Sequence, residues 1–206
     1  NRQLGKAVIL GCGYSMGPDK FYTTCLKWGI DVSSSVAESA VKAYRSAYPE
    51  IPAFWYALEE AFRSCWLSKQ PRTVGLLRFE RGGNYIRIKL PSGRWMYYHQ
   101  VKIENGELSF MNFGKKGVRG KLYGGILAEN ITQAFCRDIL CDRMLECERQ
   151  GLPVAFSVHD EIIVEIPEKI AKTAQKTFDK ILNTAPDWCK GFPLKTESAV
   201  ISRYHK

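Results

Sequence analysis

The period of the hydrophobic pattern changes at Pro71, and this change limits the chain to a mixed fold. Before Pro71, aromatic and aliphatic residues recur at the spacing of a helix face, most clearly over residues 53–69. After it, Ile86, Ile88 and Leu90 alternate with polar neighbours, which is the period of a half-buried strand. Helices followed by a run of strands predict an α+β fold.

Two turn sequences organise the strands into an antiparallel sheet. Pro91-Ser92-Gly93 separates the alternating segment from Arg94–Tyr98. Asn105-Gly106 joins Val101–Glu104 to Glu107–Met111, and Asn-Gly is a strong signal for a two-residue hairpin turn. We therefore expect a three-stranded antiparallel meander.

Helical periodicity occurs on both sides of the meander. It predicts helices at residues 2–16, 35–48, 53–69, 126–150 and 168–183. The pattern Ser35-x-x-Glu38 is typical of a helix start, and Gly151 and Pro153 end the long fourth helix. Two short apolar runs, 154–158 and 162–166, read as strands of a second hairpin.

The net charge of +9 favours either a polyanionic partner, most commonly nucleic acid, or a basic solvated surface. Many of the cations flank the meander: Arg78, Arg81, Arg87, Lys89, Arg94, Lys115, Lys116, Arg119 and Lys121. Because they are interleaved with Trp95, Tyr97 and Tyr98, they could follow a phosphate backbone. A solvated sheet face explains them equally well.

Cysteine usage indicates a reducing compartment. Seven cysteines are present, an odd number, and no C-x-x-C occurs, so neither a disulfide framework nor a zinc site is indicated. No apolar run approaches the roughly 18 residues that span a membrane, and no signal-peptide pattern is visible. These features predict a cytoplasmic location.

The junction His159-Asp160-Glu161 places two carboxylates at the tip of the second predicted hairpin. Hard divalent cations such as Mg²⁺ are held by carboxylate oxygens in fixed positions, and phosphoryl transfer uses such cations. The dipeptide alone is more often a plain polar turn.

Two helices carry polar stripes at four-residue spacing. Arg2 and Lys6 share a face that Leu10 and Tyr14 continue, so one end could hold a triphosphate and the other could meet a base. An amphipathic surface helix explains the same pattern. On the long helix, Glu129, Gln133 and Arg137 form a second stripe. It could be a solvent-exposed face, or it could contact shared acceptors in the minor groove of DNA.

The order of these motifs resembles the bacteriophage type of the family A DNA polymerases, which are similar to bacterial DNA polymerase I. Residues 2–14 resemble the motif R-x3-K-x3-(F/Y)-G-x2-Y-G, and residues 157–161 resemble V-H-D-E. Three further segments resemble phage members: residues 123–138, 90–94 and 203–206. The resemblance covers essentially the whole chain.

The resemblance implies that the first helix binds the incoming nucleotide. Arg2 and Lys6 match the positions that grip the triphosphate, and Lys6 would also neutralise or protonate the leaving pyrophosphate. Leu10 replaces the usual Phe or Tyr beside the sugar, so we expect discrimination against dideoxynucleotides. Tyr14 matches the aromatic near the templating base, and Ser15 stands where the motif has Gly.

The resemblance also implies a two-metal centre. Asp160 matches an aspartate that binds both catalytic Mg²⁺ ions, and Glu161 matches its supporting acidic neighbour. His159 would lie near the primer terminus, and Gln133 matches a minor-groove reader of the new duplex. The implied fold is part of the polymerase right hand: fingers over residues 1–70, a basic meander insertion over 71–120 and a palm portion over 121–206.

The expected function is template-directed DNA synthesis for viral replication, with primer-template DNA and deoxynucleotides as partners. The family's other catalytic aspartate lies in a D-x-S-x-x-E segment that these 206 residues do not contain. We therefore expect the isolated chain to be inactive without upstream sequence or a partner chain that supplies it. The alternatives are a catalytically incomplete DNA-binding module and an adaptor whose basic sheet binds an acidic protein.

Overall fold

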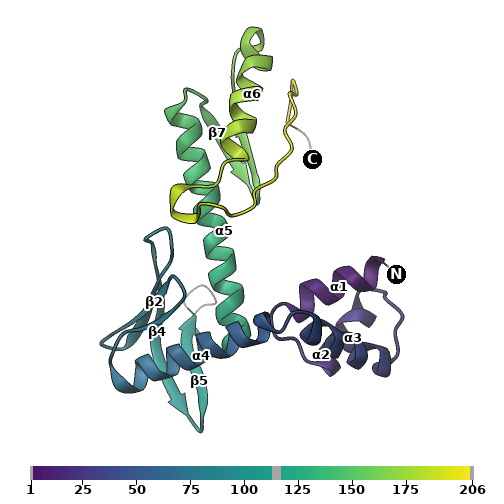
Figure 1. Cartoon of the computed structure of the whole chain (residues 1–206), viewed down its shortest axis with the longest axis vertical. Coiled ribbons are helices and arrows are strands. Elements are labelled where there is room, and N and C mark those ends of the chain that lie inside the picture. Colours follow the sequence, from purple (N-terminus) through teal and green to yellow (C-terminus); the bar gives the residue numbers. More distant parts are fainter. Residues whose placement is uncertain (1, 113–116, 205–206) are drawn as a thin grey trace. The chain divides into compact units, whose positions relative to one another are not determined.

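The computed structural model describes residues 2–112 and 117–204 of an α+β chain (Figure 1). Lys115 and Lys116 of the basic set, and His205-Lys206 of the closing motif, lie outside the described residues. Contacts divide the chain into two units, Asn1–Thr132 and Gln133–Lys206, and one helix runs through the boundary. The division into fingers, insertion and palm portion stays a prediction.

The first unit begins with four helices: α1 (Arg2–Cys12), α2 (Pro18–Lys27), α3 (Ser34–Ala47) and α4 (Glu50–Ser68). A core of small and aromatic side chains joins the first three; it consists of Ala7, Cys12, Phe21, Cys25, Ala37, Val41 and Tyr44. Helix α2 was not predicted, although Pro18 at its first position and buried Phe21 and Cys25 one turn apart are both helix signals.

Helix boundaries differ from the predictions where backbone geometry decides them. Helix α1 ends at Cys12 instead of residue 16, because a turn with Ser15 at a φ of 67° follows it. The side chain of Ser33, two residues before the expected Ser35, accepts the bond from the Val36 N–H that caps α3. Pro52 lies in the first turn of α4, where the missing N–H costs no helical bond.

The sheet of the first unit has six antiparallel strands in sequential order, not the three that were predicted. They are β1 (Arg72–Val74), β2 (Leu77–Gly82), β3 (Tyr85–Lys89), β4 (Trp95–Glu104), β5 (Glu107–Asn112) and β6 (Val118–Leu122). One face is apolar, and α4 packs against strands β1, β2 and β3 on that side. Figure 1 shows α4 lying along the sheet. There Phe79, Ile86 and Ile88 are fully buried, and Phe62 of α4 meets the ring of Tyr98 edge-on at 5.4 Å.

Two glycines bring the start of α5 (Gly124–Arg149) close to the rest of the first unit. A methyl group added at Gly124 would lie 2.1 Å from the carbonyl oxygen of Trp55, and one at Gly125 would lie 2.5 Å from that of Tyr14. The indole N–H of Trp55 also donates to the Gly13 carbonyl at 3.0 Å. Helix α4, the turn after α1 and the start of α5 are therefore closely packed.

The second unit contains the rest of α5, strands β7 (Val154–Val158) and β8 (Glu161–Val164), and helix α6 (Ala171–Leu182). Two short 3-10 helices, η2 (Glu168–Ile170) and η3 (Asp187–Cys189), flank α6. The unit has its own core of Cys147, Leu152, Ala174, Phe178 and Ile181. Across both described ranges, no helix combines the length and the apolar character needed to span a membrane.

Candidate functional site

Strands β7 and β8 form the predicted hairpin, with the acidic pair at its tip. Val158 pairs with Glu161, so His159 and Asp160 form a two-residue loop. His159 has a φ of 52°, the positive value that tight hairpin loops require at their first position. The side chains of His159, Asp160 and Glu161 are all exposed. The loop therefore presents two adjacent carboxylates to solvent.

The strands behind the tip are fixed by the core of the second unit. Val154, Ile162 and Val164 pack against that core. A carboxylate oxygen of Glu148 accepts the Val154 N–H at 2.7 Å, which ties β7 to the end of α5. Because side chains alternate along a strand, Glu161 and Ile163 project from the other face. The strands that carry the tip are thus anchored to the core of the second unit and to the end of α5.

The chain's C-terminal segment meets this second face of the hairpin. The hydroxyl of Tyr204 donates to a carboxylate oxygen of Glu161 at 2.9 Å, and its ring packs edge-on against Phe156 at 5.3 Å. The bond to a carboxylate raises the pKa of Tyr204, because ionised Glu161 disfavours a phenolate beside it. The contact holds the Glu161 side chain in one orientation.

The donor set at the tip suits Mg²⁺. No cluster of three or more His, Cys, Asp or Glu side chains that could hold a metal ion occurs within residues 2–112 and 117–204. Mg²⁺ commonly takes only one or two protein carboxylates and completes its shell with water and substrate phosphates. Asp160 and Glu161 supply hard oxygen ligands of that kind.

Helix α1 presents the predicted stripe to solvent. Arg2, Lys6 and Leu10 are exposed on one side, with Leu10 at 53%, while Ala7 is buried in the core on the other. Two cations one turn apart on an exposed helix can contact neighbouring phosphate groups. The structure therefore brings three of the four predicted nucleotide-binding residues onto one face.

The fourth of these residues, Tyr14, lies in the turn beyond the end of α1 and is half-buried. The contact of Gly125 with the Tyr14 carbonyl and the bond from Trp55 to Gly13 fix this turn. Ser15, where the resembled motif has Gly, adopts the left-handed conformation that favours glycine. Backbone geometry thus gives a physical reason for a glycine at this position.

We predict that Ser15→Gly raises the free energy of unfolding of the first unit by about 0.5–1 kcal/mol. A left-handed residue with a side chain costs about 1–2 kcal/mol, and the entropy of glycine in the unfolded chain offsets part of the gain. Urea unfolding followed by tryptophan fluorescence measures this difference in the free energy of unfolding. A lower midpoint for the variant would show that the hydroxymethyl group stabilises the turn.

The stripe on α5 is also exposed at Gln133 and Arg137, whereas Glu129 is half-buried. Gln133 belongs to the second unit with the hairpin, and Arg2, Lys6, Leu10 and Tyr14 belong to the first. Within the second unit, His159, Asp160 and Glu161 come together at one tip.

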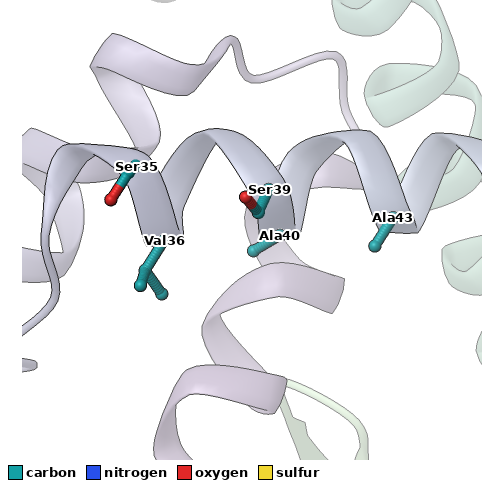
Figure 2. A pocket seen from close by; sticks show the side chains of 5 residues that line it. All are labelled: Ser35, Val36, Ser39, Ala40 and Ala43. Atoms are coloured by element: carbon teal, nitrogen blue, oxygen red, sulfur yellow. The ribbon is translucent and has the colours of Figure 1, made fainter.

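One hollow of the first unit lies elsewhere, along α3. Figure 2 shows its lining side chains, which are Ser35, Val36, Ser39, Ala40 and Ala43. None of them is charged or contains a strong nucleophile. This hollow therefore offers nothing to hold a phosphate or a metal ion.

Among curated proteins, the chain is 31% identical over 219 aligned residues to the DNA polymerase of Bacillus phage SP02. The alignment covers the whole of this chain and 33% of that protein. The chain is a relative of a phage DNA polymerase. It spans about a third of that polymerase's length. No family model and no solved structure matches the chain.

Sequence reasoning missed three features of this polymerase relative. The contact of Tyr204 with Glu161 joins residues 43 positions apart, and no local pattern reveals such a pair. The left-handed conformations of Ser15 and His159 were also missed. For Ser15 a signal existed, since the resembled motif has glycine there.

Proposed function

We propose that this chain is the fingers and palm portion of a family A phage DNA polymerase, and that it takes part in template-directed DNA synthesis together with polypeptide that supplies the rest of the active site. The observation that carries the proposal is the hairpin that presents Asp160 and Glu161 at its exposed tip, in a chain similar along its whole length to a phage DNA polymerase. In this reaction the primer 3′-hydroxyl attacks the α-phosphate of a deoxynucleotide, and pyrophosphate leaves.

Asp160 and Glu161 are the residues that would hold Mg²⁺. The bound ions would neutralise phosphate charge and align the attacking and leaving oxygens. The hydrogen bond from Tyr204 engages one Glu161 oxygen, and the Glu161 side chain is exposed. The loop backbone at His159 is held in an uncommon conformation for a non-glycine residue, and such conformations are concentrated at functional sites.

On α1, Arg2 and Lys6 would bind the triphosphate of the incoming nucleotide. Both are exposed, so their ammonium and guanidinium groups can reach phosphate oxygens without crossing the core. Leu10 would contact the sugar, and Tyr14 would lie near the templating base. Gln133 would read shared acceptors in the minor groove of the new duplex, and His159 would lie near the primer terminus.

A second metal-binding aspartate is part of this proposal. The resemblance places it in a D-x-S-x-x-E segment, which does not occur in the 206 residues. We propose that the isolated chain does not polymerise and that polypeptide outside these residues supplies that carboxylate. Without that second carboxylate, the chain would bind primer-template DNA but would not extend the primer.

A chimera tests the proposal. Residues 1–206 replace the matching third of the Bacillus phage SP02 polymerase, and extension of a labelled primer is followed with Mg²⁺ and deoxynucleotides. We expect template-dependent extension by the chimera and none by residues 1–206 alone. A folded chimera that binds primer-template but does not extend it under any metal condition would instead support the DNA-binding module.

The role of Lys6 gives a separate prediction. In the chimera, Lys6→Ala should lower kcat/KM for deoxynucleotides about 10- to 100-fold, because a hydrogen bond to a charged group contributes about 1.5–3 kcal/mol. Lys20→Ala, which removes an exposed lysine from neighbouring α2, is the matched control and should change little. Equal effects of the two substitutions would exclude a specific phosphate contact at Lys6.

A further inference from the structure

The six-stranded sheet has a second face, opposite the apolar face that contacts α4. Strand residues that alternate with buried Ile86 and Ile88 project from it, and strand pairing places Tyr85, Arg87 and Lys89 opposite His99, Tyr97 and Trp95. We call this side the outer sheet face; β2, β5 and β6 extend it. An antiparallel sheet commonly leaves such a face to water, where polar side chains are the usual occupants.

The centre of the outer sheet face is aromatic. The rings of Tyr97 and His99 lie nearly parallel, with centroids 5.9 Å apart and an angle of 10° between their planes. Tyr85 on the neighbouring strand lies 5.6 Å from Tyr97 and 5.8 Å from His99. Tyr97 is 47% exposed, and Tyr85 and His99 are half-buried, so the Tyr97 ring is the most accessible of the three.

Cations lie beside a fourth ring of this face, that of Trp95. Arg87 lies over the ring of Trp95 at 4.1 Å, and Lys89 lies over the same ring at 5.8 Å. The sheet register also places Arg78 of β2, and Arg119 and Lys121 of β6, on this face.

Acidic side chains neutralise only part of this charge. Glu80 pairs with Arg87 at 2.6 Å and with Arg78 at 2.8 Å, and Glu107 pairs with Lys121 at 2.7 Å. On the described strands, basic side chains of the outer sheet face outnumber its carboxylates, in keeping with the basic chain as a whole. The ion pair with Glu80 holds the Arg87 guanidinium beside the ring of Trp95.

We infer that the outer sheet face binds single-stranded DNA. The phosphates of the DNA contact the basic side chains, and its unpaired bases stack on Tyr85, Tyr97 and His99. Single-stranded DNA uses both the rings and the cations of the face. A base stacked on an aromatic ring contributes about 1–3 kcal/mol of binding free energy, and contacts between cations and the phosphate backbone add an electrostatic contribution. An acidic protein would use the cations but would leave the exposed ring of Tyr97 and its two half-buried neighbours unexplained. Paired bases of a duplex cannot present their flat faces to them.

This DNA site is distinct from the metal-dependent chemistry proposed above and does not require it. Binding can be measured in EDTA with the 206-residue chain, where the metal-dependent reaction does not run. A failure of the polymerase proposal would therefore not change the result of the binding experiment. A failure to bind single-stranded DNA would likewise leave the polymerase proposal standing.

The experiment is fluorescence anisotropy of a labelled 12-nucleotide oligo(dT) titrated with the chain in EDTA. Tyr97→Ala should weaken binding about tenfold, because one stacking partner is lost, and Tyr97→Phe should restore it. Tyr56→Ala removes a 71% exposed tyrosine from α4 and should leave affinity unchanged. Lys89→Gln should weaken binding at low salt and reduce its salt dependence.

Three results would overturn the inference. The first is equal affinity of Tyr97→Ala and Tyr56→Ala, with both variants folded by circular dichroism. The second is a failure of Tyr97→Phe to restore binding when Tyr97→Ala has lost it. The third is competition by polyglutamate or by duplex DNA as strong as that by unlabelled oligo(dT), which would indicate charge recognition alone.

Discussion

Replacing Asp160 by Asn in the chimera should lower the rate of primer extension at saturating nucleotide by about a thousandfold or more. The substitution keeps the size of the side chain but removes the charge that a hard cation requires. Loss of about 4 kcal/mol of charge stabilisation in the transition state corresponds to that factor. Single-turnover extension with rapid quenching measures it.

Asp187→Asn is the matched control for this prediction. It removes the same charge from an exposed aspartate in the same unit, at the start of η3, and should leave the rate unchanged. Affinity for primer-template, measured separately, should be similar in both variants. If Asp160→Asn extended primers as fast as Asp187→Asn, the tip carboxylate would have no part in catalysis.

The second large effect concerns stability. Gly124→Ala should lower the free energy of unfolding of the first unit by about 3 kcal/mol or more, because overpacking against a rigid backbone is among the costliest substitutions. The added methyl would lie 2.1 Å from the Trp55 carbonyl oxygen and 2.6 Å from its carbon, so α4 and α5 would have to separate. The separation would also break the bond from the Gly124 N–H to Glu59, which is 2.9 Å long.

Gly5→Ala is the control for this stability prediction. Gly5 lies in α1, and no atom lies within 4 Å of an added methyl group there. Alanine should stabilise the helix by up to about 1 kcal/mol. Urea titrations of both variants, followed by tryptophan fluorescence, give opposite shifts in midpoint if the close approach at Gly124 is real. Shifts of the same sign and size would show that α5 can move away from α4 without cost.

The sequence predicted those parts of the fold that depend on local periodicity. The alternation at Ile86 and Ile88 and the Asn105-Gly106 turn correctly predicted strands β3, β4 and β5. Strand β1 was missed because three residues are too few for a pattern to appear. Strand β6 was missed because Gly120 interrupts its alternation, and it is recognised only through its pairing with β5.

The candidate sites were likewise predictable where they depend on local sequence patterns and not where they depend on tertiary contacts. Four-residue spacing correctly placed Arg2, Lys6 and Leu10 on one exposed face, and two β-rich runs around a polar junction correctly placed Asp160 at a hairpin tip. The hydrogen bond that orients Glu161 comes from the far end of the chain, so it depends on tertiary structure. Roles in nucleotide and metal binding came from the family resemblance, and they stay predictions.

The central claim is that the tip of the β7–β8 hairpin binds a divalent cation, and paramagnetic broadening by Mn²⁺ tests it most directly. In amide NMR spectra of the 206-residue chain, low Mn²⁺ should first broaden the signals of His159, Asp160 and Glu161. Excess Mg²⁺ should reverse this, and Asp160→Asn should abolish it. Broadening that is uniform, or as strong around Asp187 as at the tip, would contradict the claim.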